Sequence, residues 1–343
     1  MWRLSGRAGR AFGAQARYNR QADEPFKRVQ RGRKGNEMHL ISIDDLTAAD
    51  IDNLFRLSDG FLEIASRPIK KVPTLRGRTI INVFLEASTR TQSSFELAGK
   101  RLSADVINIK GSSSSVSKGE SLKDTILTLE SYRPDIIVMR HPQVGASRMA
   151  TRYTNASVVN AGDGTGEHPT QCLLDLYSLR RVFGDMKGLK VAIVGDILRS
   201  RVARSDLFGF RKMGIDVRLV GPPTLIPPGI EYWDVPVYND LSALEDVDVV
   251  YLLRMQLERA KGKVPPVPSL REYSRVWGLS PYRLKPEQRV MHPGPINRGV
   301  ELSADLADDD RSLILHQVES GLAVRMAILY QCLAGSLADE AVV

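Results

Sequence analysis

Short apolar runs, rich in β-branched residues, alternate with amphipathic segments along most of this chain. Four such runs occur in the first half: Thr79–Glu86, Asp105–Lys110, Asp135–Arg140 and Ser157–Gly162. Four more follow in the second half: Lys190–Asp196, Asp216–Gly221, Asp248–Arg254 and Arg289–His292. Strands that alternate with helical segments form βα units on a parallel sheet. The pattern therefore predicts an α/β protein with two parallel-sheet domains joined by helices.

Two long helices are predicted between and after these runs. One is expected from about His168 to Phe183, and an amphipathic helix, roughly from Gln317 to Leu333, closes the chain. The length of 343 residues suits two domains of roughly 150 residues each. We place the domain boundary near Gly184 to Gly188. The first domain is then residues 38–184, the second is residues 185–335 with the C-terminal helix, and residues 336–343 form a tail.

The composition excludes several classes of protein. No window approaches the roughly 20 uninterrupted apolar residues of a membrane span. Two cysteines, Cys172 and Cys332, are too few for a disulfide framework or a four-thiolate metal site. Their scarcity is typical of a reducing compartment, so we expect a cytoplasmic protein. No G-x-G-x-x-G follows the nucleotide-like strand Val191–Asp196, which disfavours dinucleotide binding.

Residues 1–37 carry most of the positive charge. This leader has ten Lys or Arg against three acidic residues and supplies +7 of the net charge of +8. It lacks apolar periodicity, as disordered segments do. Four interpretations stay open: a tail that contacts a partner, a nucleic-acid-binding arm, a transit peptide, or an untranslated stretch with Met38 as the true start. Because the rest of the chain is nearly neutral, we expect no nucleic-acid binding by the folded domains.

Polar and mostly cationic side chains follow the predicted strands. They are Ser88, Thr89, Arg90 and Thr91; Arg140 and His141; His168 and Gln171; Arg199, Arg201 and Arg204; Arg254 and Gln256; and His292–Pro295. Ligands of open α/β sheets bind beyond the carboxyl ends of the strands, and hydroxyls at a helix N-terminus suit an anion. With only five histidines and no plausible metal cluster, the sequence predicts a pocket for small ligands that carry several negative charges.

Each of these residues also has a purely structural interpretation. Ser88 taken alone is better explained as a helix N-cap, and a single arginine usually forms a surface ion pair. His168 before Pro169 could simply begin a helix. The serine-rich loop Gly111–Lys118 is a linker by composition, although Ser121 and Asp124 predict a helix start just after it. The shared position of the arginines after buried strands favours a common site.

Six segments closely resemble the catalytic chains of aspartate carbamoyltransferases. They are FLEASTRTQSSFE at 84–96, VMRHP at 138–142, NAGDGTGEHPTQCLLDL at 160–176, SRVARS at 200–205, LLRMQLER at 252–259 and MHPGPINRGVEL at 291–302. The resemblance runs from about Met38 to about Gly335. It implies a carbamoyltransferase-like fold with a carbamoyl-phosphate-binding domain followed by an aspartate-binding domain. It also implies transfer of the carbamoyl group of carbamoyl phosphate to L-aspartate in pyrimidine biosynthesis.

The resemblance implies a role for each candidate residue. Carbamoyl phosphate would bind to Ser88, Thr89, Arg90, Thr91, Arg140, His168, Gln171, Gly294 and Pro295. Aspartate would bind to Lys118, Arg201, Arg254 and Gln256. Arg90, Arg140, His168 and Lys118 would be catalytic. Ser114 and Lys118 would reach into a neighbouring subunit, which implies a homotrimer with shared active sites. No cofactor or metal is expected, because phosphate is a good leaving group and the amine is the nucleophile.

Alternatives to this function remain. The chain could be a transcarbamoylase for another amine, such as ornithine, although paired Arg201 and Arg254 favour a dicarboxylate acceptor. It could also be a catalytically silent homologue, but such a protein would be expected to lose Arg90, Lys118, Arg140 or His168, and all are present. Association with regulatory or dihydroorotase-like chains, nucleotide regulation and assembly beyond a trimer stay open.

Overall fold

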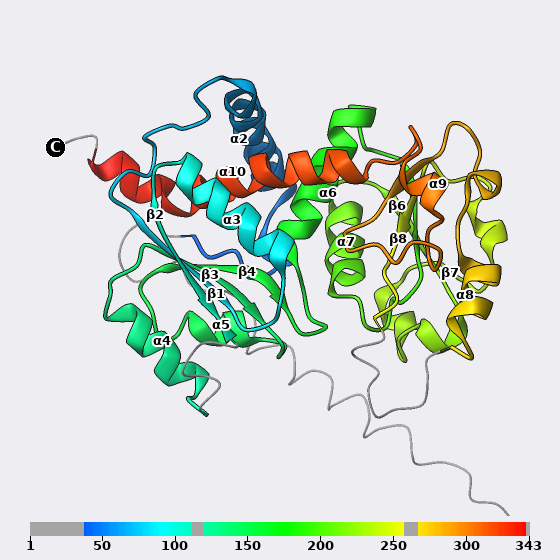
Figure 1. Ribbon diagram of the computed structural model, residues 1–343, viewed down its shortest axis with the longest axis horizontal. Helices are drawn as coiled ribbons and strands as arrows, with labels where there is room; N and C mark the ends of the chain where they lie inside the picture. The colour runs from blue at the N-terminus through cyan, green and yellow to red at the C-terminus, as the bar shows by residue number, and fades with distance from the viewer. Residues whose placement is uncertain (1–37, 112–118, 257–266, 341–343) are drawn as a thin grey trace, which may run out of the picture.

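Two all-parallel sheets form the framework of the protein (Figure 1). The computed structural model describes residues 38–111, 119–256 and 267–340, with side chains described up to residue 334. The first sheet has the order β2-β1-β3-β4 and the second β7-β6-β5-β8-β9. The strands of the first sheet are β1 Thr79–Phe84, β2 Asp105–Lys110, β3 Ile136–His141 and β4 Ser157–Asp163. Those of the second are β5 Lys190–Val194, β6 Asp216–Val220, β7 Val237–Tyr238, β8 Val249–Leu252 and β9 Arg289–Met291.

The α-helices alternate with these strands. In chain order they are α2 Ala48–Ser66, α3 Thr89–Arg101, α4 Leu122–Glu130, α5 Ala146–Ala150, α6 Pro169–Phe183, α7 Arg201–Lys212, α8 Leu270–Trp277, α9 Ala304–Ala307 and α10 Ile314–Glu340. The predicted α/β class with two parallel sheets is thus confirmed. The leader 1–37 and the loop residues Ser114 and Lys118 lie outside the described residues.

The observed elements differ from the predicted ones mainly at their ends. Five strands, β1, β5, β6, β8 and β9, end one or two residues before the predicted limit, and β3 and β4 end one residue after it. Helix α2 and the two-residue strand β7 were not predicted. The predicted C-terminal helix is longer, since α10 begins at Ile314 and ends at Glu340. The predicted helix start after the serine-rich loop is confirmed, because the Ser121 hydroxyl accepts a hydrogen bond from the Asp124 N–H at 3.2 Å.

One hydrophobic core joins the two sheets. It contains buried residues of the first sheet, such as Ile80, and of the second, such as Leu219, together with Tyr177 on α6 and Met326 on α10. Helix α10 packs against α2, α3 and α6, which lie beside the first sheet (Figure 1). The predicted division at residue 184, with α10 in the second domain, stays a prediction.

The strand order places a crevice at the carboxyl edge of each sheet. Strand β1 pairs with β2 on one side and β3 on the other, and β5 pairs with β6 and β8. The central pairs are β1 with β3 and β5 with β8. The connections that leave the two strands of such a pair go to opposite faces of the sheet, which opens a space beyond the strand ends. The loops after β1, β3, β5 and β8 therefore lie where a ligand can enter.

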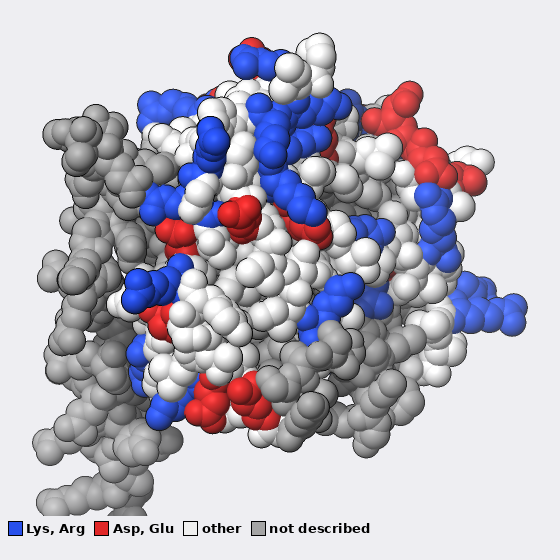
Figure 2. Space-filling model, turned by 60° about the vertical axis from the view of Figure 1, so that its left-hand side comes forward, with Lys and Arg blue, Asp and Glu red and all other residues white. Residues whose placement is uncertain are grey.

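Basic side chains gather on one part of the surface. Figure 2 shows Lys and Arg side chains on the upper part of one face. Lys70, Lys71, Lys100 and Arg101 line a shallow hollow where α3 ends and β2 begins.

Among the helices that the structure describes, none has both the length and the apolar character needed to cross a membrane.

Candidate active site

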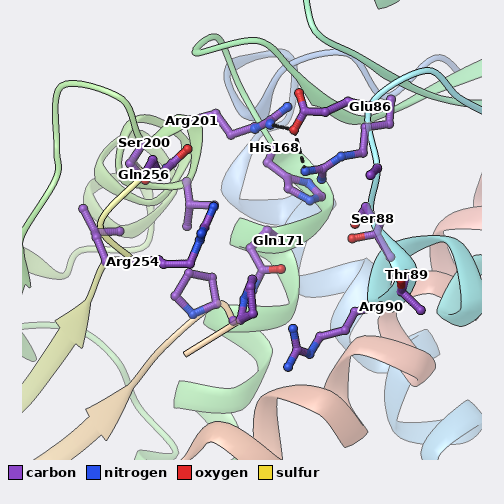
Figure 3. A pocket seen from close by; sticks show the side chains of 18 residues that line it. Glu86, Ser88, Thr89, Arg90, His168, Gln171, Ser200, Arg201, Arg254 and Gln256 are labelled. Atoms are coloured by element: carbon purple, nitrogen blue, oxygen red, sulfur yellow. Dashed lines mark hydrogen bonds and ion pairs between the residues drawn. The ribbon is translucent and has the colours of Figure 1, made fainter. Parts of the chain in front are cut away.

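A cavity of about 470 Å³ lies where the carboxyl ends of the two sheets meet. It is lined by every described residue that was expected to bind a substrate: Ser88, Thr89, Arg90, Thr91, Arg140, His168, Gln171, Arg201, Arg254, Gln256, Gly294 and Pro295. In Figure 3, His168 and Gln171 lie between Arg201 and Arg254 on one side and Ser88, Thr89 and Arg90 on the other. Residues far apart in the sequence thus line one space.

Four other polar residues that follow strands are not among the cavity-lining residues: His141, Arg199, Arg204 and His292. Each has a structural contact instead. His141 Nδ1 accepts from the Gln143 N–H at 3.0 Å, and the Arg204 guanidinium lies 4.8 Å from the ring centre of Trp233. A position just after a strand is therefore not sufficient to place a polar residue in the cavity wall.

The first turn of α3 forms one wall of the cavity. Ser88 is the N-cap of this helix, but its side chain makes no capping hydrogen bond. The first N–H groups of an α-helix have no partner within the helix, and the positive end of the helix dipole adds to their pull on an anion. With its hydroxyl not used for capping, Ser88 joins Thr89, Arg90 and Thr91 as a set of donors around this wall. The wall suits a phosphate group.

Glu86 is a site residue that was not predicted from the sequence. One of its carboxylate oxygens, Oε1, accepts a hydrogen bond from Arg140 Nη2 at 2.9 Å and another from Arg201 Nη2. Arg201 belongs to α7, which follows strand β5 of the second sheet, so the Glu86 carboxylate links the two halves of the site (Figure 3). Glu86 stands at the end of the first predicted strand. An acidic residue at a strand end among several arginines was the signal that could have identified it.

Gly162 lets two arginines approach the backbone. Its φ is +112°, and a Cβ atom placed there would lie 3.1 Å from Arg201 Nη1 and 3.2 Å from Arg140 Nη1. Arg140 Nη1 also donates to the Ala161 carbonyl at 3.3 Å. A side chain at residue 162 would therefore push both guanidinium groups away by a few tenths of an ångström.

We expect Gly162→Ala to lower kcat/KM by about 10-fold, because an error of about 1 Å in catalytic groups costs about 100-fold and the shift here is a few tenths of an ångström. Gly188→Ala is the matched control. Gly188 also has a positive φ, +78°, but nothing lies within 4 Å of its Cβ position. Both variants should lose about 1 kcal/mol of stability from backbone strain, measured by urea denaturation, and only Gly162→Ala should lose activity. Equal activities of the two variants would contradict this role of Gly162.

His168 is held in a neutral form. It is 4% exposed, its backbone N–H donates to Ser205 Oγ at 2.9 Å, and its Nδ1 lies 3.3 Å from Thr170 Oγ1. Burial, and then the charges of Arg140, Arg201 and Arg325, lower the pKa of His168 well below its usual value. A neutral imidazole with Nδ1 bonded to a hydroxyl can offer Nε2–H to a carbonyl oxygen in the cavity.

The second wall of the cavity follows strands β5, β8 and β9. The segment after β8 is fixed by buried Asp196, whose carboxylate accepts from the Gln256 N–H at 3.2 Å and from Arg199 Nη1 at 3.1 Å. Gly294 lies against Arg90, since a Cβ atom at residue 294 would lie 3.3 Å from Arg90 Cζ. Five further cavity residues had no predicted role: Ala87, Ser200, Val202, Leu253 and Pro293.

The cavity residues can bind and stabilise a substrate through their charges and hydrogen bonds. In residues 38–111, 119–256 and 267–340, no group of three or more His, Cys, Asp or Glu is arranged to hold a metal ion. Among the described residues that line the cavity, the guanidinium groups of Arg90, Arg140, Arg201 and Arg254 outnumber the carboxylate of Glu86. Such a site can bind two anionic substrates side by side and stabilise negative charge that develops between them.

This fold and this cavity define an α/β enzyme that acts on small polyanionic substrates. The sequence model of the aspartate/ornithine carbamoyltransferase carbamoyl-P binding domain matches residues 38–181. That of the aspartate/ornithine carbamoyltransferase Asp/Orn binding domain matches residues 187–332. The chain belongs to the aspartate/ornithine carbamoyltransferase family.

Curated relatives agree with this family. The aspartate carbamoyltransferase catalytic subunit of Geobacter sulfurreducens is 58% identical over 306 residues, which cover 88% of this chain and 98% of the relative. That of Syntrophotalea carbinolica is 52% identical over 309 residues, with 89% of this chain and 98% of the relative covered.

Solved structures with the same fold include two aspartate transcarbamoylases. The Trypanosoma cruzi protein in complex with aspartate and phosphate has a TM-score of 0.77 and 31% identity, and the match covers 86% of this chain and 96% of that one. The catalytic subunit from M. Jannaschii has a TM-score of 0.74 and 36% identity, over 86% of this chain and 98% of that one.

Proposed function

We propose that this chain transfers the carbamoyl group of carbamoyl phosphate to L-aspartate, giving N-carbamoyl-L-aspartate and phosphate. The observation that carries the proposal is the pairing, within one cavity, of the anion-binding start of α3 with Arg201 and Arg254 on the opposite side. The curated relatives are named aspartate carbamoyltransferase catalytic subunit, and one of the similar structures is a complex with aspartate and phosphate. Both substrates are anions, which suits the excess of arginine over acidic residues in the cavity wall.

Carbamoyl phosphate binds on the α3 side in this proposal. The phosphate group accepts hydrogen bonds from Ser88, Thr89, Arg90 and Thr91, and Arg140 bridges a phosphate oxygen and the carbamoyl carbonyl oxygen. His168 donates to the same carbonyl oxygen. Gln171 and the backbone of Gly294 and Pro295 contact the carbamoyl amine.

Aspartate binds on the opposite side. Arg201 and Arg254 hold its two carboxylates, and Gln256 supports Arg254. Two such ion pairs fix the position and direction of the amine, which converts a collision of two anions into a reaction between fixed partners. Lys118 completes the aspartate site and Ser114 adds a polar contact, both from a neighbouring subunit of a homotrimer; these two residues lie outside the described part of the chain.

The reaction needs only positioning and electrostatic stabilisation. The neutral amine nitrogen of aspartate attacks the carbamoyl carbon, and the carbonyl oxygen gains negative charge that Arg140 and His168 stabilise. The bond from carbon to the bridging phosphate oxygen then breaks, and phosphate leaves with the electron pair. The proton released by the amine passes to the departing phosphate. His168 takes part as a neutral donor, since burial and nearby arginines keep its pKa low.

The wider context of the reaction belongs to the same proposal. We assign residues 38–184 to the carbamoyl-phosphate-binding domain and residues 185–335 to the aspartate-binding domain. We place the protein in the cytoplasm and in pyrimidine biosynthesis. Partners such as regulatory or dihydroorotase-like chains would add to the trimer and are not needed for the proposed chemistry.

The first test is turnover by the purified protein with carbamoyl phosphate and either L-aspartate or L-ornithine. We expect N-carbamoyl-L-aspartate to form, with turnover of ornithine lower by at least about 100-fold, because Arg201 and Arg254 would face a cationic side chain. Sedimentation of the same sample should give a particle of three chains. Preferred turnover of ornithine would favour the alternative transcarbamoylase. No turnover from a folded trimer would favour a silent homologue.

A further inference from the structure

A buried carboxylate lies directly behind the carbamoyl side of the cavity. Asp175, on α6 one turn after Gln171, is completely buried. Gln171 Nε2 donates to both of its oxygens, at 3.1 Å to Oδ1 and 3.2 Å to Oδ2. Because the amide nitrogen of Gln171 is bound in this way, its carbonyl oxygen is left to face the cavity, where Gln171 lies among the lining residues (Figure 3).

The same carboxylate reaches two other parts of the site. Gln317 Nε2, on α10, donates to Asp175 Oδ1 at 2.6 Å, and Gln317 Oε1 accepts from the His292 N–H at 2.9 Å. His292 directly precedes Pro293, Gly294 and Pro295 of the cavity wall. Tyr251, on β8 just before Leu253 and Arg254, donates its hydroxyl proton to Asp175 Oδ2 at 2.7 Å. One carboxylate thus contacts side chains from α6, α10 and β8.

Resting on the proposed function, we propose that Asp175 is a positioning residue: its carboxylate orients Gln171 toward the carbamoyl amine and, through Gln317, fixes the Pro293–Pro295 segment against the same group. Asp175 is not among the residues that line the cavity, so it acts through these neighbours. A carboxylate suits this role, since it offers several acceptor positions and no donor. Its three partners, Gln171, Gln317 and Tyr251, all act as hydrogen-bond donors to it.

A second buried carboxyl group has a different surrounding. Asp206, on α7, is also completely buried. Its carboxyl group faces Tyr251 and Cys172, but neither oxygen meets the distance and angle of a hydrogen bond with a described residue. Burial, and then the negative charge of Asp175, raise the pKa of Asp206 well above its usual value. Of the two groups, Asp175 is therefore the first to ionise as the pH rises, while Asp206 keeps its proton.

The charged and titratable groups around Asp175 come from each element that packs on it. They are Cys172 on α6, Asp206 on α7, Tyr251 on β8 and Arg325 on α10. Burial, opposed by the hydrogen bonds of Gln317, Tyr251 and Gln171, raises the pKa of Asp175 to about 7. As the pH falls through this value, Asp175 gains a proton and loses acceptor capacity. Asp175 therefore accepts the hydrogen bonds that orient Gln171 and Gln317 above about pH 7, and this effect is lost below that pH.

The test compares Asp175→Asn with Asp206→Asn in the full-length protein. We expect Asp175→Asn to lower kcat by about 100-fold, because its amide cannot accept from all three neighbours and the carbamoyl contacts shift. Its affinity for inorganic phosphate, measured by calorimetry, should stay within about twofold of wild type, since the start of α3 is untouched. Asp206→Asn replaces a neutral acid with a neutral amide and should keep wild-type kcat.

A pH series separates positioning from simple packing. The ratio of wild-type to Asp175→Asn kcat should fall toward one below about pH 7, because the wild-type carboxylate is then protonated too. A ratio that does not change with pH, or a wild-type kcat for Asp175→Asn, would overturn the inference. If Asp175→Asn does not fold, Gln317→Met and Tyr251→Phe take its place. Each should lower kcat several-fold with phosphate affinity unchanged, and wild-type kcat in both would overturn it.

The wild-type protein is assayed first, so that the two proposals fail in different ways. No carbamoyl transfer by wild type contradicts the proposed function. Normal transfer by wild type together with normal transfer by the Asp175 variant leaves the proposed function standing and contradicts only the positioning role.

Discussion

Replacement of Arg90 by alanine should lower kcat/KM for carbamoyl phosphate by about 10²- to 10³-fold, because removal of one charge-stabilising donor from an active site typically costs about that factor. The guanidinium group lies in the first turn of α3, lines the cavity and packs against Gly294. In the proposed reaction it holds the phosphate group while that group leaves, so it stabilises charge that increases in the transition state.

Lys100→Ala is the control for Arg90, because Lys100 lies at the far end of the same helix, outside the cavity, and its side chain pairs with Glu96. Its kcat/KM should be unchanged. In Arg90→Ala, steady-state assays should show a lower kcat/KM for carbamoyl phosphate, and inorganic phosphate should bind more weakly. If phosphate affinity and kcat/KM remained at wild-type values, phosphate would have to bind elsewhere in the cavity.

Replacement of Arg254 by alanine should lower kcat/KM for aspartate by about 10²- to 10³-fold, because removal of one partner of a close ion pair typically costs about 2–5 kcal/mol. The proposed function assigns Arg254 to one aspartate carboxylate, and Asp196 fixes the adjoining backbone at Gln256. The KM for carbamoyl phosphate should change little, because that substrate binds at the start of α3.

The control for Arg254 is Arg271→Ala, at an exposed position of α8 outside the cavity. It should keep wild-type kinetics with both substrates. Equal losses for both substrates in Arg254→Ala would point to a general disturbance of the cavity. Unchanged aspartate kinetics would remove Arg254 from the acceptor site.

The neighbouring arginine of the acceptor site is more tightly built in. Arg201 is 4% exposed and shares the Glu86 carboxylate with Arg140. Its replacement would leave Glu86 and Arg140 with altered partners, so a loss of activity would have more than one cause. Arg254 therefore gives the cleaner test of the acceptor clamp.

The class of fold and most of the cavity wall follow from local patterns of residues. Apolar runs of β-branched residues dictate buried strands, and polar residues that follow such strands must lie at the carboxyl edge of a parallel sheet. For this reason Arg90, Arg140, His168, Arg201 and Arg254 could be named from the sequence alone. Strand direction places Arg90, Arg140 and His168 at the carboxyl edge of the first sheet and Arg201 and Arg254 at that of the second. That the two edges line one cavity depends on how the sheets pack together.

The residues that connect the two halves of the site are identified only by the packing of distant elements. Glu86 meets Arg140 across the neighbouring strands β1 and β3, but it meets Arg201 only because the two sheets face each other, and no local pattern records that approach. Asp175 meets Gln317 from 142 positions away because α6 and α10 pack together in one core. Local sequence specifies strands, helix starts and side-chain chemistry. The contacts between distant carboxylates, amides and guanidinium groups depend on how those elements pack, because burial and distance set both their hydrogen bonds and their charge.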